Sequence, residues 1–329
     1  MNKRDDRVIR VIELLADGEF HSGQDIGEDI GVSRTAISQY IKQIQALGLD
    51  VFRVTGKGYR LAHSINLLDE PEIEKALGEE HRSSFEVCRV VTSSNDVLRQ
   101  RLNEQSSLEA GYAVLAEAQT AGRGRRGKSW YSPFASNLYV SMYWPLEHGM
   151  AGAMGLSIAI GTALASTLSE EGVADVELKW PNDVLVKGKK LAGILIELEG
   201  QAIDSAHAII GVGINLNMPE WLASPIEQPW TDVATEINGP VVRNRLAARL
   251  LESLRQALTR YDADGLGSFI EQWQRFDSLE GKAVRLLFGE KSIAGTAVGI
   301  AEDGSLLVNV DGQVKRFHAG EVSLRYEAK

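Results

Sequence analysis

The residues best suited to chemistry in this chain are three arginines set among three glycines, Gly-Arg-Gly-Arg-Arg-Gly at positions 122–127. Glycine allows positive φ and lets the backbone approach a ligand closely. The arginine guanidinium is planar, permanently charged and shaped to bind phosphate or carboxylate. This composition predicts a loop that holds an anion, and the ordinary alternative is a solvated basic loop.

The same segment has the spacing G-x-G-x-x-G of dinucleotide-binding folds. That fingerprint requires a strand before it and a helix directly after it, because the phosphate sits at the helix N-terminus. A strand is predicted at 112–117, but residues 128–133, Lys-Ser-Trp-Tyr-Ser-Pro, bring aromatic residues and an early proline. Since this is not a helix opening, we reject the dinucleotide interpretation.

Two segments further along carry more polar groups. Residues 179–183 read Lys-Trp-Pro-Asn-Asp, which places a lysine, an amide and a carboxylate around a rigid turn. Lys190 opens an otherwise apolar strand, where a lysine is costly unless it meets an anion. On their own, these residues also fit a surface turn and an exposed strand end.

A third polar cluster, Thr-Ser-Ser-Asn-Asp at 92–96, follows the predicted strand 85–91 and opens a helix that runs to about residue 103. Hydroxyl and amide side chains at this place commonly cap the helix. They could equally hydrogen-bond the polar head of a ligand at the helix N-terminus.

Length and composition indicate an ordinary globular protein of two or three domains. The chain has 329 residues, 44% hydrophobic and 24% charged, with a formal net charge of −10. This charge argues against a globally basic nucleic-acid binder but allows a local basic patch. The single cysteine, Cys88, is expected to be a small core residue, and the apolar stretch 151–168 a buried helix rather than a membrane span.

The distribution of polar residues also bears on compartment and metal content. The six histidines have no ligand spacing, so no dedicated metal site is predicted. The chain starts with charged residues and shows no signal peptide. A reducing cytoplasm fits these features.

The first 63 residues predict a winged helix-turn-helix. An apolar face at helical spacing marks a first helix, Ser22 can cap a second helix at 23–30, and Ser33 can cap a third that runs to about residue 47. Two short strands around a glycine turn follow at 51–61. In such a fold the third helix enters the major groove and the hairpin contacts the DNA backbone.

Charge supports this orientation. Residues 1–32 carry four basic and eight acidic residues, whereas residues 33–62 carry five basic residues and Asp50 alone. The residues expected to face DNA are Ser22, Ser33, Arg34, Thr35, Ser38, Gln39, Lys42 and Lys57. The alternative is a winged helix used for protein contacts or one that has lost its operator.

The rest of the chain predicts an α/β domain and then a small β domain. Strands are expected at 112–119, 137–144, 176–180, 184–187, 190–199 and 206–214, and helices at 152–170, 243–260 and 268–276. From residue 283 on, short strands alternate with glycine turns at Gly289, Gly304 and Gly312.

Taken in order, these segments resemble the family of bifunctional biotin–protein ligases and biotin-operon repressors. The resemblance rests on the segment 122–127, on Ser-Pro-Phe at 132–134 with Asn-Leu-Tyr at 137–139, on 179–183, on Lys-Leu-Ala-Gly-Ile-Leu at 190–195, and on Gly-Val-Gly-Ile-Asn at 211–215. It covers nearly the whole chain, because the winged helix precedes all five segments.

The resemblance implies an α+β protein of three domains. These would be a winged helix-turn-helix at 1–63, a catalytic domain with a mixed sheet like that of class II synthetases at 64–277, and an SH3-like β-barrel at 278–329. The implied reaction joins biotin and ATP into biotinyl-5′-adenylate and pyrophosphate. The biotinyl group is then transferred to one lysine of the biotin carboxyl carrier protein of acetyl-CoA carboxylase.

The resemblance further implies regulation. The adenylate would act as corepressor, favouring a homodimer that binds the biotin operator. Mg²⁺ would be held largely by ATP rather than by a protein cage.

Site residues follow from the same resemblance. Catalytic roles fall on Arg123, Arg125, Lys190 and Asp183. The biotin site would comprise Ser93, Ser94, Asn95, Gln119, Arg123, Gly124, Arg125, Lys190, Gly193, Gly211 and Gly213. The adenylate site would comprise Arg125, Arg126, Trp130, Lys179, Asn182, Asn215 and Trp230.

Two other functions remain open from the residues. A lipoate or octanoate ligase shares the catalytic fold, although residues 179–183 favour biotin. A transcription factor that senses biotin or its adenylate without catalysis is the second, and the three arginines with Lys190 argue against it.

Overall fold

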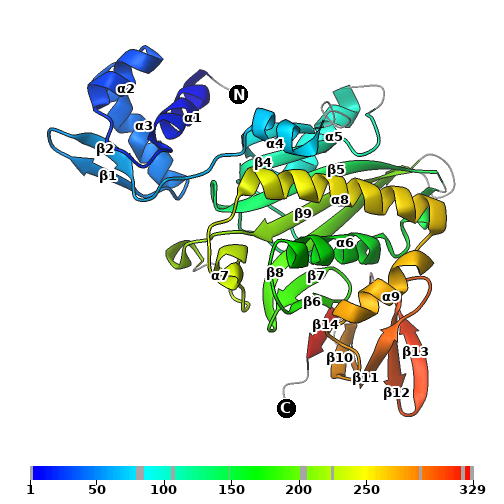
Figure 1. Ribbon diagram of the computed structural model, residues 1–329. Coiled ribbons are helices and arrows are strands. Elements are labelled where there is room, and N and C mark those ends of the chain that lie inside the picture. Colours follow the sequence, from blue (N-terminus) through cyan, green and yellow to red (C-terminus); the bar gives the residue numbers. More distant parts are fainter. Residues whose placement is uncertain are drawn as a thin grey trace.

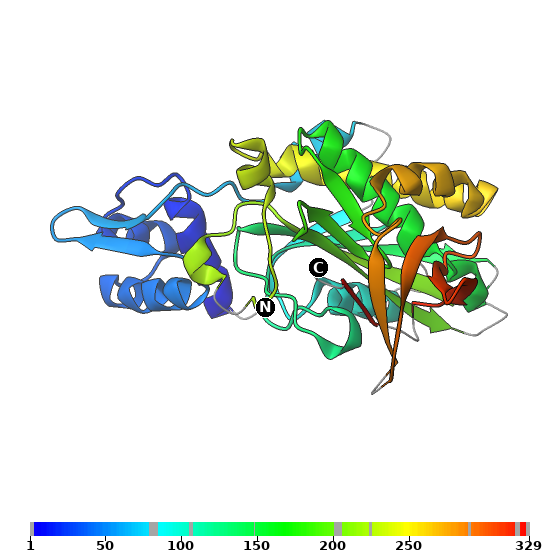
Figure 2. The ribbon, with the colours of Figure 1, turned by 90° about the horizontal axis from the view of Figure 1, so that it is seen from below.

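The computed structural model describes residues 3–78, 85–104, 108–147, 149–200, 206–223, 226–288, 291–319 and 323–326. Three units follow one another along the chain, with the N-terminal unit standing to one side of a central sheet and the C-terminal unit packed at its far end (Figure 1). The view from below shows the same separation of the N-terminal unit (Figure 2).

The N-terminal unit has the predicted helix-turn-helix and wing. Its elements are α1 (Lys3–Leu15), α2 (Gly23–Ile30), α3 (Arg34–Ala46), β1 (Val51–Val54) and β2 (Gly58–Leu61). Ser22 accepts a hydrogen bond from the backbone N–H of Asp25, and Ser33 from that of Ala36, so both serines cap their helices.

An isolated β-bridge joins the wing to the segment before α2, which the sequence did not predict. His21 and Tyr59 exchange backbone hydrogen bonds of 2.9 and 2.8 Å. Gly58 makes this pairing possible, because it has a φ of 108° and a Cβ there would lie 1.9 Å from the carbonyl oxygen of His21.

The central unit is built on a seven-stranded mixed sheet in the order β3-β4-β5-β9-β8-β7-β6. Only β3 and β4 are parallel, and the other neighbours are antiparallel. The strands are β3 (Phe85–Val91), β4 (Ala113–Gln119), β5 (Asn137–Leu146), β6 (Val176–Lys179), β7 (Asp183–Val186), β8 (Lys189–Gly200) and β9 (Ala206–Asn215).

Helices cover the two faces of this sheet unequally. The long helices α6 (Leu156–Glu170) and α8 (Arg243–Asp264) pack together on one face, joined by α4 (Glu70–Leu77) and α9 (Gly267–Phe276). The opposite face carries α5 (Ser94–Glu104), which packs on β4, β5 and β9. The large core lies on the α6 and α8 side, and a small cluster around Leu98 and Val114 lies under α5.

The stretch Gly149–Glu170 is long and apolar enough to cross a membrane. Fifty-six per cent of its apolar window is buried inside the protein. It is divided into a 3-10 turn, η3 (Gly149–Ala153), and α6, because Gly155 adopts the left-handed conformation with a φ of 79°. The helix predicted from residue 152 therefore begins at Leu156 and packs as a core helix.

The C-terminal unit is a five-stranded antiparallel sheet in the order β13-β12-β11-β10-β14. Its strands are β10 (Ala283–Phe288), β11 (Lys291–Ile300), β12 (Leu306–Val310), β13 (Gln313–Phe317) and β14 (Ser323–Tyr326). The turns at Gly304 and Gly312 have positive φ, whereas Gly289 lies outside the described residues. The indole N–H of Trp180 donates to the carbonyl of Gly304 at 2.9 Å, which fastens this sheet to the central unit.

A chain of alternating charges joins the first unit to the second. Glu117 on β4 is fully buried and accepts from Arg243 of α8 at 2.8 Å and from Arg89 of β3 at 3.4 Å. Arg89 also contacts Glu13 of α1 at 3.3 Å. Because a buried carboxylate is costly without cationic partners, this group fixes several segments at once.

Some predictions differ in detail from the structure. The strand predicted at 176–180 ends at Lys179, because Trp180 begins the turn with a cis peptide bond to Pro181. Cys88 on β3 is half-buried and packs against the small cluster under α5, and burial raises the pKa of its thiol to about 11. The helix from residue 243 continues to Asp264.

Three smaller elements complete the part of the chain that the structure describes. They are η2 (Arg125–Gly127) in the arginine loop, η4 (Glu220–Leu222) and α7 (Val233–Ile237) in the segment after β9. None of these was predicted. Each is one or two turns long, which is too short for a periodic apolar pattern.

Candidate functional site

A pocket lies on the α5 face of the central sheet, at the ends of β4, β5, β8 and β9. Side chains on a strand alternate between its two faces. On these strands, one set packs in the core, as do Val140, Val212 and Ile194. The other set includes Ser141, Gly193, Gly211 and Gly213, which leave room and a hydrogen-bonding group beneath α5.

The floor of the pocket is made of rows that run across three strands. Ser141 pairs with Gly211, which pairs with Leu195. In the next row Tyr139 pairs with Gly213, which pairs with Gly193. Glycines within strands let a ligand or another side chain approach the backbone closely.

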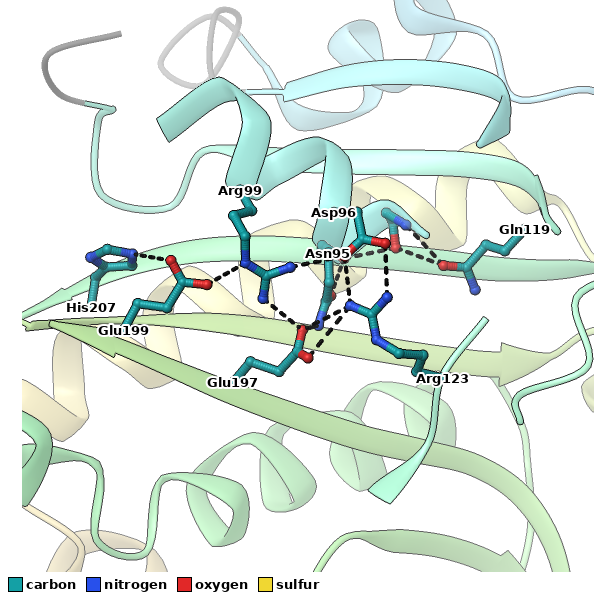
Figure 3. A network of polar contacts seen from close by, with 10 residues as sticks. Asn95, Asp96, Arg99, Gln119, Arg123, Glu197, Glu199 and His207 are labelled. Atoms are coloured by element: carbon teal, nitrogen blue, oxygen red, sulfur yellow. Dashed lines mark hydrogen bonds and ion pairs between the residues drawn. The ribbon is translucent and has the colours of Figure 1, made fainter. Parts of the chain in front are cut away.

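A continuous row of hydrogen bonds lies along one wall (Figure 3). Gln119 accepts from the backbone N–H of Ser94 at 2.9 Å and donates to Ser132 at 3.0 Å. The hydroxyl of Ser141 lies 2.7 Å from that of Ser94 and 2.5 Å from Oδ1 of Asn95. Ser94 and Asn95 are buried, so this wall offers fixed polar groups to a ligand head.

The arginine loop forms a small hairpin over the pocket. Trp130 N–H donates to Gly122 at 2.8 Å and Gly124 N–H donates to Lys128 at 2.7 Å. A Cβ on Gly122 would lie 2.4 Å from the carbonyl oxygen of Trp130, which explains the glycine at the base of the hairpin.

Arg125 carries the clearest electrostatic signal in this loop. Its guanidinium donates to Oδ1 of Asn182 at 3.2 Å and to the carbonyl of Ala319 in the C-terminal unit at 2.5 Å. Both acceptors are neutral. Burial lowers the pKa of Arg125, the neighbouring Arg126 lowers it further, and the charge of Asp183 offsets part of this shift. A half-buried cation whose hydrogen-bond acceptors are neutral favours an anionic ligand.

Lys190 closes the opposite wall. Its ammonium lies 2.7 Å from Oδ1 of Asp183 and 5.3 Å from the ring centre of Trp130. The Trp130 ring lies over Gly193 and Gly213, since a Cβ on either glycine would lie within 3.1 Å of it. The charge on Lys190 is thus held at the pocket by a carboxylate and an aromatic face.

Arg123, which is predicted to belong to the biotin site, contacts two carboxylates of the protein. Its two terminal nitrogens donate to both oxygens of Asp96 at 2.8 and 2.7 Å. Nη2 also lies 3.3 Å from Glu197. Its charge is therefore already matched by protein carboxylates, although the residue lines the pocket.

The pocket brings together thirteen of the residues predicted for the biotin and adenylate sites. They are Ser93, Ser94, Asn95, Gln119, Arg123, Gly124, Arg125, Trp130, Asn182, Lys190, Gly193, Gly211 and Gly213. Asp183 is adjacent through its ion pair with Lys190.

Four further predicted residues lie outside the pocket lining. Asn215 is buried and donates to the carbonyls of Lys190 and Thr231, so it fastens the segment that carries Trp230 to β8. Trp230 forms an isolated bridge with Lys190. Lys179 is half-buried and Arg126 is exposed with a φ of 58°.

Sequence reasoning missed several groups that shape the pocket. Ser132 and Ser141 complete the hydrogen-bonded wall, and Tyr139 lines the floor. The carboxylates of Asp96 and Glu197 hold Arg123. Ser141, a serine inside the apolar strand predicted at 137–144, could have indicated a polar position in the site. The contact between Glu197 and Arg123 could not be predicted, because the two residues are 74 positions apart in the sequence.

Among the residues that the structure describes, no group of three or more His, Cys, Asp or Glu side chains could hold a metal ion. The described side chains at the pocket are instead cationic, amide and hydroxyl groups. They suit a polar organic ligand with an anionic part.

The second candidate site is the outer face of α3. Ile37, Tyr40, Ile41 and Ile44 are buried against the other helices. The residues predicted to face DNA lie on the opposite side: Ser33, Arg34, Thr35, Gln39 and Lys42 are exposed and Ser38 is half-exposed. Lys57 is exposed on the wing, and its ammonium lies 5.7 Å from the ring centre of Phe20. The structure thus presents a polar, basic helix face.

Comparison with known protein families gives three matches along the chain. Residues 7–60 match the model described as an HTH domain. Residues 87–215 match the biotin/lipoate A/B protein ligase family, and residues 281–325 match the biotin protein ligase C terminal domain. Their order is that of the three units of the structure.

Curated relatives match nearly the whole chain. The bifunctional ligase/repressor BirA of Escherichia coli K12 is 43% identical, with 98% of each chain covered. The protein of the same description from Bacillus subtilis 168 is 28% identical, with 95% of this chain and 97% of that one covered. Among solved structures, the biotin protein ligase from Aquifex aeolicus in complex with biotin and ATP is 28% identical. It has a TM-score of 0.63 and covers 74% of this chain and 100% of that chain.

The contact between Trp130 and Gly213 gives a structural prediction. In Gly213→Ala the new Cβ would lie 2.6 Å from Nε1 and Cε2 of the Trp130 indole, so the ring has to move. We expect one of the six indole N–H signals in a ¹H–¹⁵N correlation spectrum to shift, the one that is missing in Trp130→Phe.

Gly267→Ala is the matched control, because its added Cβ meets no atom within 4 Å. It should leave all six signals in place. An unchanged Trp130 signal in Gly213→Ala would contradict the described position of the indole.

Proposed function

This chain belongs to the family of bifunctional biotin ligases and repressors, and from this premise we propose how its pocket and its DNA-binding unit work. The chain is a biotin–protein ligase that uses ATP, and its helix-turn-helix unit serves transcriptional repression. The residue roles, the acceptor protein and the regulatory switch that follow are our proposals.

The first half-reaction forms a mixed anhydride. A carboxylate oxygen of biotin attacks the α-phosphorus of ATP, the bond to the bridging oxygen breaks, and pyrophosphate leaves with its electron pair. Negative charge builds on the phosphate oxygens as this occurs. Fixed cationic donors at that place lower the barrier because they require no reorganisation during the reaction.

The single observation that carries this proposal is the position of Arg125. Its half-buried guanidinium donates hydrogen bonds to the neutral oxygens of Asn182 and Ala319. We assign Arg125 to the α-phosphate and the reacting carboxylate. Lys190, 2.7 Å from Asp183, is assigned to the same oxygens from the other wall.

The hydrogen-bonded wall is assigned to the polar head of biotin. Ser93, Ser94, Asn95 and Gln119 supply hydroxyl, amide and backbone groups in a buried setting. Gly193 and Gly213 let the Trp130 ring lie close against the floor, and Gly211 does the same for the Asn95 amide. Trp130 and Trp230 are assigned to the adenine end, together with Lys179, Asn182, Asn215 and Arg126.

We propose that Mg²⁺ binds together with ATP. The ion would neutralise the charge of the polyphosphate and so favour departure of pyrophosphate. Since the described residues contain no cluster of three or more possible metal ligands, we assign the ion to the phosphates rather than to a protein cage.

In the second half-reaction, the ε-amine of an acceptor lysine attacks the acyl carbon of the adenylate and AMP leaves. An amide bond forms and the anhydride bond breaks. We propose the biotin carboxyl carrier protein of acetyl-CoA carboxylase as acceptor, in the cytoplasm. A relative from Mycobacterium tuberculosis, 30% identical over 64% of this chain, is described as a biotin–[acetyl-CoA-carboxylase] ligase, which supports this acceptor.

The reaction itself gives a direct test of substrate choice. The purified protein is incubated with biotin, ATP and Mg²⁺ without acceptor, and bound products are identified by mass spectrometry. We expect biotinyl-adenylate, and with lipoate in a parallel sample we expect none, because residues 179–183 and the polar wall suit biotin. Adenylate from lipoate alone would replace this proposal with a lipoate ligase, and no adenylate from either would support a non-catalytic sensor.

We further propose that the adenylate acts as corepressor by favouring a homodimer on operator DNA. The segment after β9 links the two sites physically. Trp230 pairs with Lys190 at the pocket. Leu222 in the same segment lies against Gly48 at the end of α3, where an added Cβ would be 3.1 Å from its Cδ2. A ligand that orders this segment therefore acts next to the DNA-binding helix.

This coupling predicts that adenylate raises both dimerisation and operator affinity, each by about tenfold or more, since linked equilibria shift together. Sedimentation measures the first and fluorescence anisotropy with DNA from upstream of the biotin genes measures the second. Lys42→Ala should weaken DNA binding without changing dimerisation. Equal dimerisation with and without adenylate would remove the switch.

A further inference from the structure

A group of charged side chains outside the reacting centre surrounds one edge of the pocket (Figure 3). It joins the first turns of α5, the arginine loop and the far half of β8. None of these carboxylates has a role in the chemistry proposed above. Their contacts point to a function in holding the biotin site.

Asp96 and Arg123 form a paired contact. Asp96 lies in the first turn of α5, directly after Asn95, and accepts from both terminal nitrogens of Arg123 at 2.7 and 2.8 Å. This two-point geometry fixes the guanidinium plane as well as its distance. The hydrogen bond from Arg123 is the main cause that lowers the pKa of Asp96, so the carboxylate is ionised at neutral pH.

Arg99 supports Asp96 from one turn further along α5. It donates to Oδ1 of Asp96 at 2.8 Å and lies 3.3 Å from Glu197. Glu199 accepts from Nε of Arg99 and lies 3.5 Å from His207. Positive and negative groups alternate around this cluster, and each arginine contacts at least two carboxylates.

Glu197 connects the cluster to the wall of the pocket. Its Oε2 accepts from Nδ2 of Asn95 at 2.7 Å and lies 3.3 Å from Arg123. An ionised carboxylate only accepts hydrogen bonds, so it draws the amide nitrogen of Asn95 toward itself. The amide oxygen then faces Ser141, whose hydroxyl lies 2.5 Å away.

We propose that Asp96 and Glu197 are positioning residues of the biotin site, where Asp96 holds the arginine loop closed through Arg123 and Glu197 sets the orientation of the Asn95 amide. This inference rests on the biotin ligase function proposed above and adds residues that act through others rather than on the substrate. In this proposal, the backbone of the arginine loop at Arg123 lines the pocket, and its guanidinium charge is neutralised by Asp96 and Glu197.

We call the paired contact between Asp96 and Arg123 the clamp. Its loss has consequences that differ from the loss of a catalytic group. Freed from Asp96, the loop spends less time closed, so biotin binds less tightly and the adenylate leaves faster. The cations at the reacting phosphate, Arg125 and Lys190, have other partners. The chemical step on bound substrate therefore stays close to its original rate.

Asp96→Asn, Glu197→Gln and Arg123→Gln test this proposal. For each we expect the KM for biotin and the dissociation rate of biotinyl-adenylate to rise on the order of tenfold, the size expected for one charge-assisted hydrogen bond. For Asp96→Asn and Glu197→Gln, kcat should stay within about twofold, because these two residues do not touch the reacting groups. The effects of Asp96→Asn and Arg123→Gln should be less than additive in the double variant, since each single variant already breaks the paired contact between the two residues.

Glu86→Gln is the matched control. Glu86 on β3 binds Arg101 of α5 through two contacts of 2.8 and 3.0 Å, so it ties the same helix to the sheet away from the pocket. It should leave KM and the adenylate lifetime unchanged. Circular dichroism melts of all variants show whether any effect follows from general loss of structure.

The outcomes separate this inference from the function on which it rests. No adenylate from the wild-type protein would overturn the ligase function itself. An active wild type with Asp96→Asn or Glu197→Gln indistinguishable from Glu86→Gln would overturn the assignment of that residue. Additive effects of Asp96→Asn and Arg123→Gln would show that Arg123 acts on the ligand directly and would overturn the clamp.

Discussion

The structure depends on a half-buried cation whose hydrogen-bond acceptors carry no charge. Arg125 lies beside the pocket and donates to the neutral oxygens of Asn182 and Ala319, and burial lowers its pKa. Keeping such a group charged is unfavourable until an anion arrives. The fold therefore contributes to the affinity for phosphate or carboxylate, because it removes part of the water around the Arg125 guanidinium before the ligand binds.

Three segments from two units meet at Arg125. The arginine loop and the turn after β6, both in the central unit, supply Arg125 and Asn182, and the C-terminal unit supplies the carbonyl of Ala319. The same turn anchors the C-terminal unit through Trp180 and Gly304. On the other side of the sheet, the buried Glu117 fixes α8 and β3 and reaches α1 through Arg89 and Glu13. The pocket thus lies between elements that are tied to both neighbouring units.

The sequence predicted what depends on neighbouring residues. Ser22 and Ser33 cap their helices because a cap is decided within three residues, and the apolar face of α1 follows helical spacing. The glycines of β8 and β9 marked the floor of the site. The sequence could not predict pairings across long separations. The sequence does not show which anion Arg123 contacts. Only the fold brings Asp96, 27 residues away, and Glu197, 74 residues away, within hydrogen-bonding distance of it.

The central claim is that Arg125 supplies the charge that selects an anionic ligand. Calorimetry with two stable analogues of biotinyl-adenylate tests it, one with an anionic linker and one with a neutral linker of the same length. The account predicts that the wild type prefers the anionic analogue by about tenfold or more, and that Arg125→Gln removes most of this preference while still binding the neutral analogue. An equal preference in the wild type and in Arg125→Gln would contradict the account.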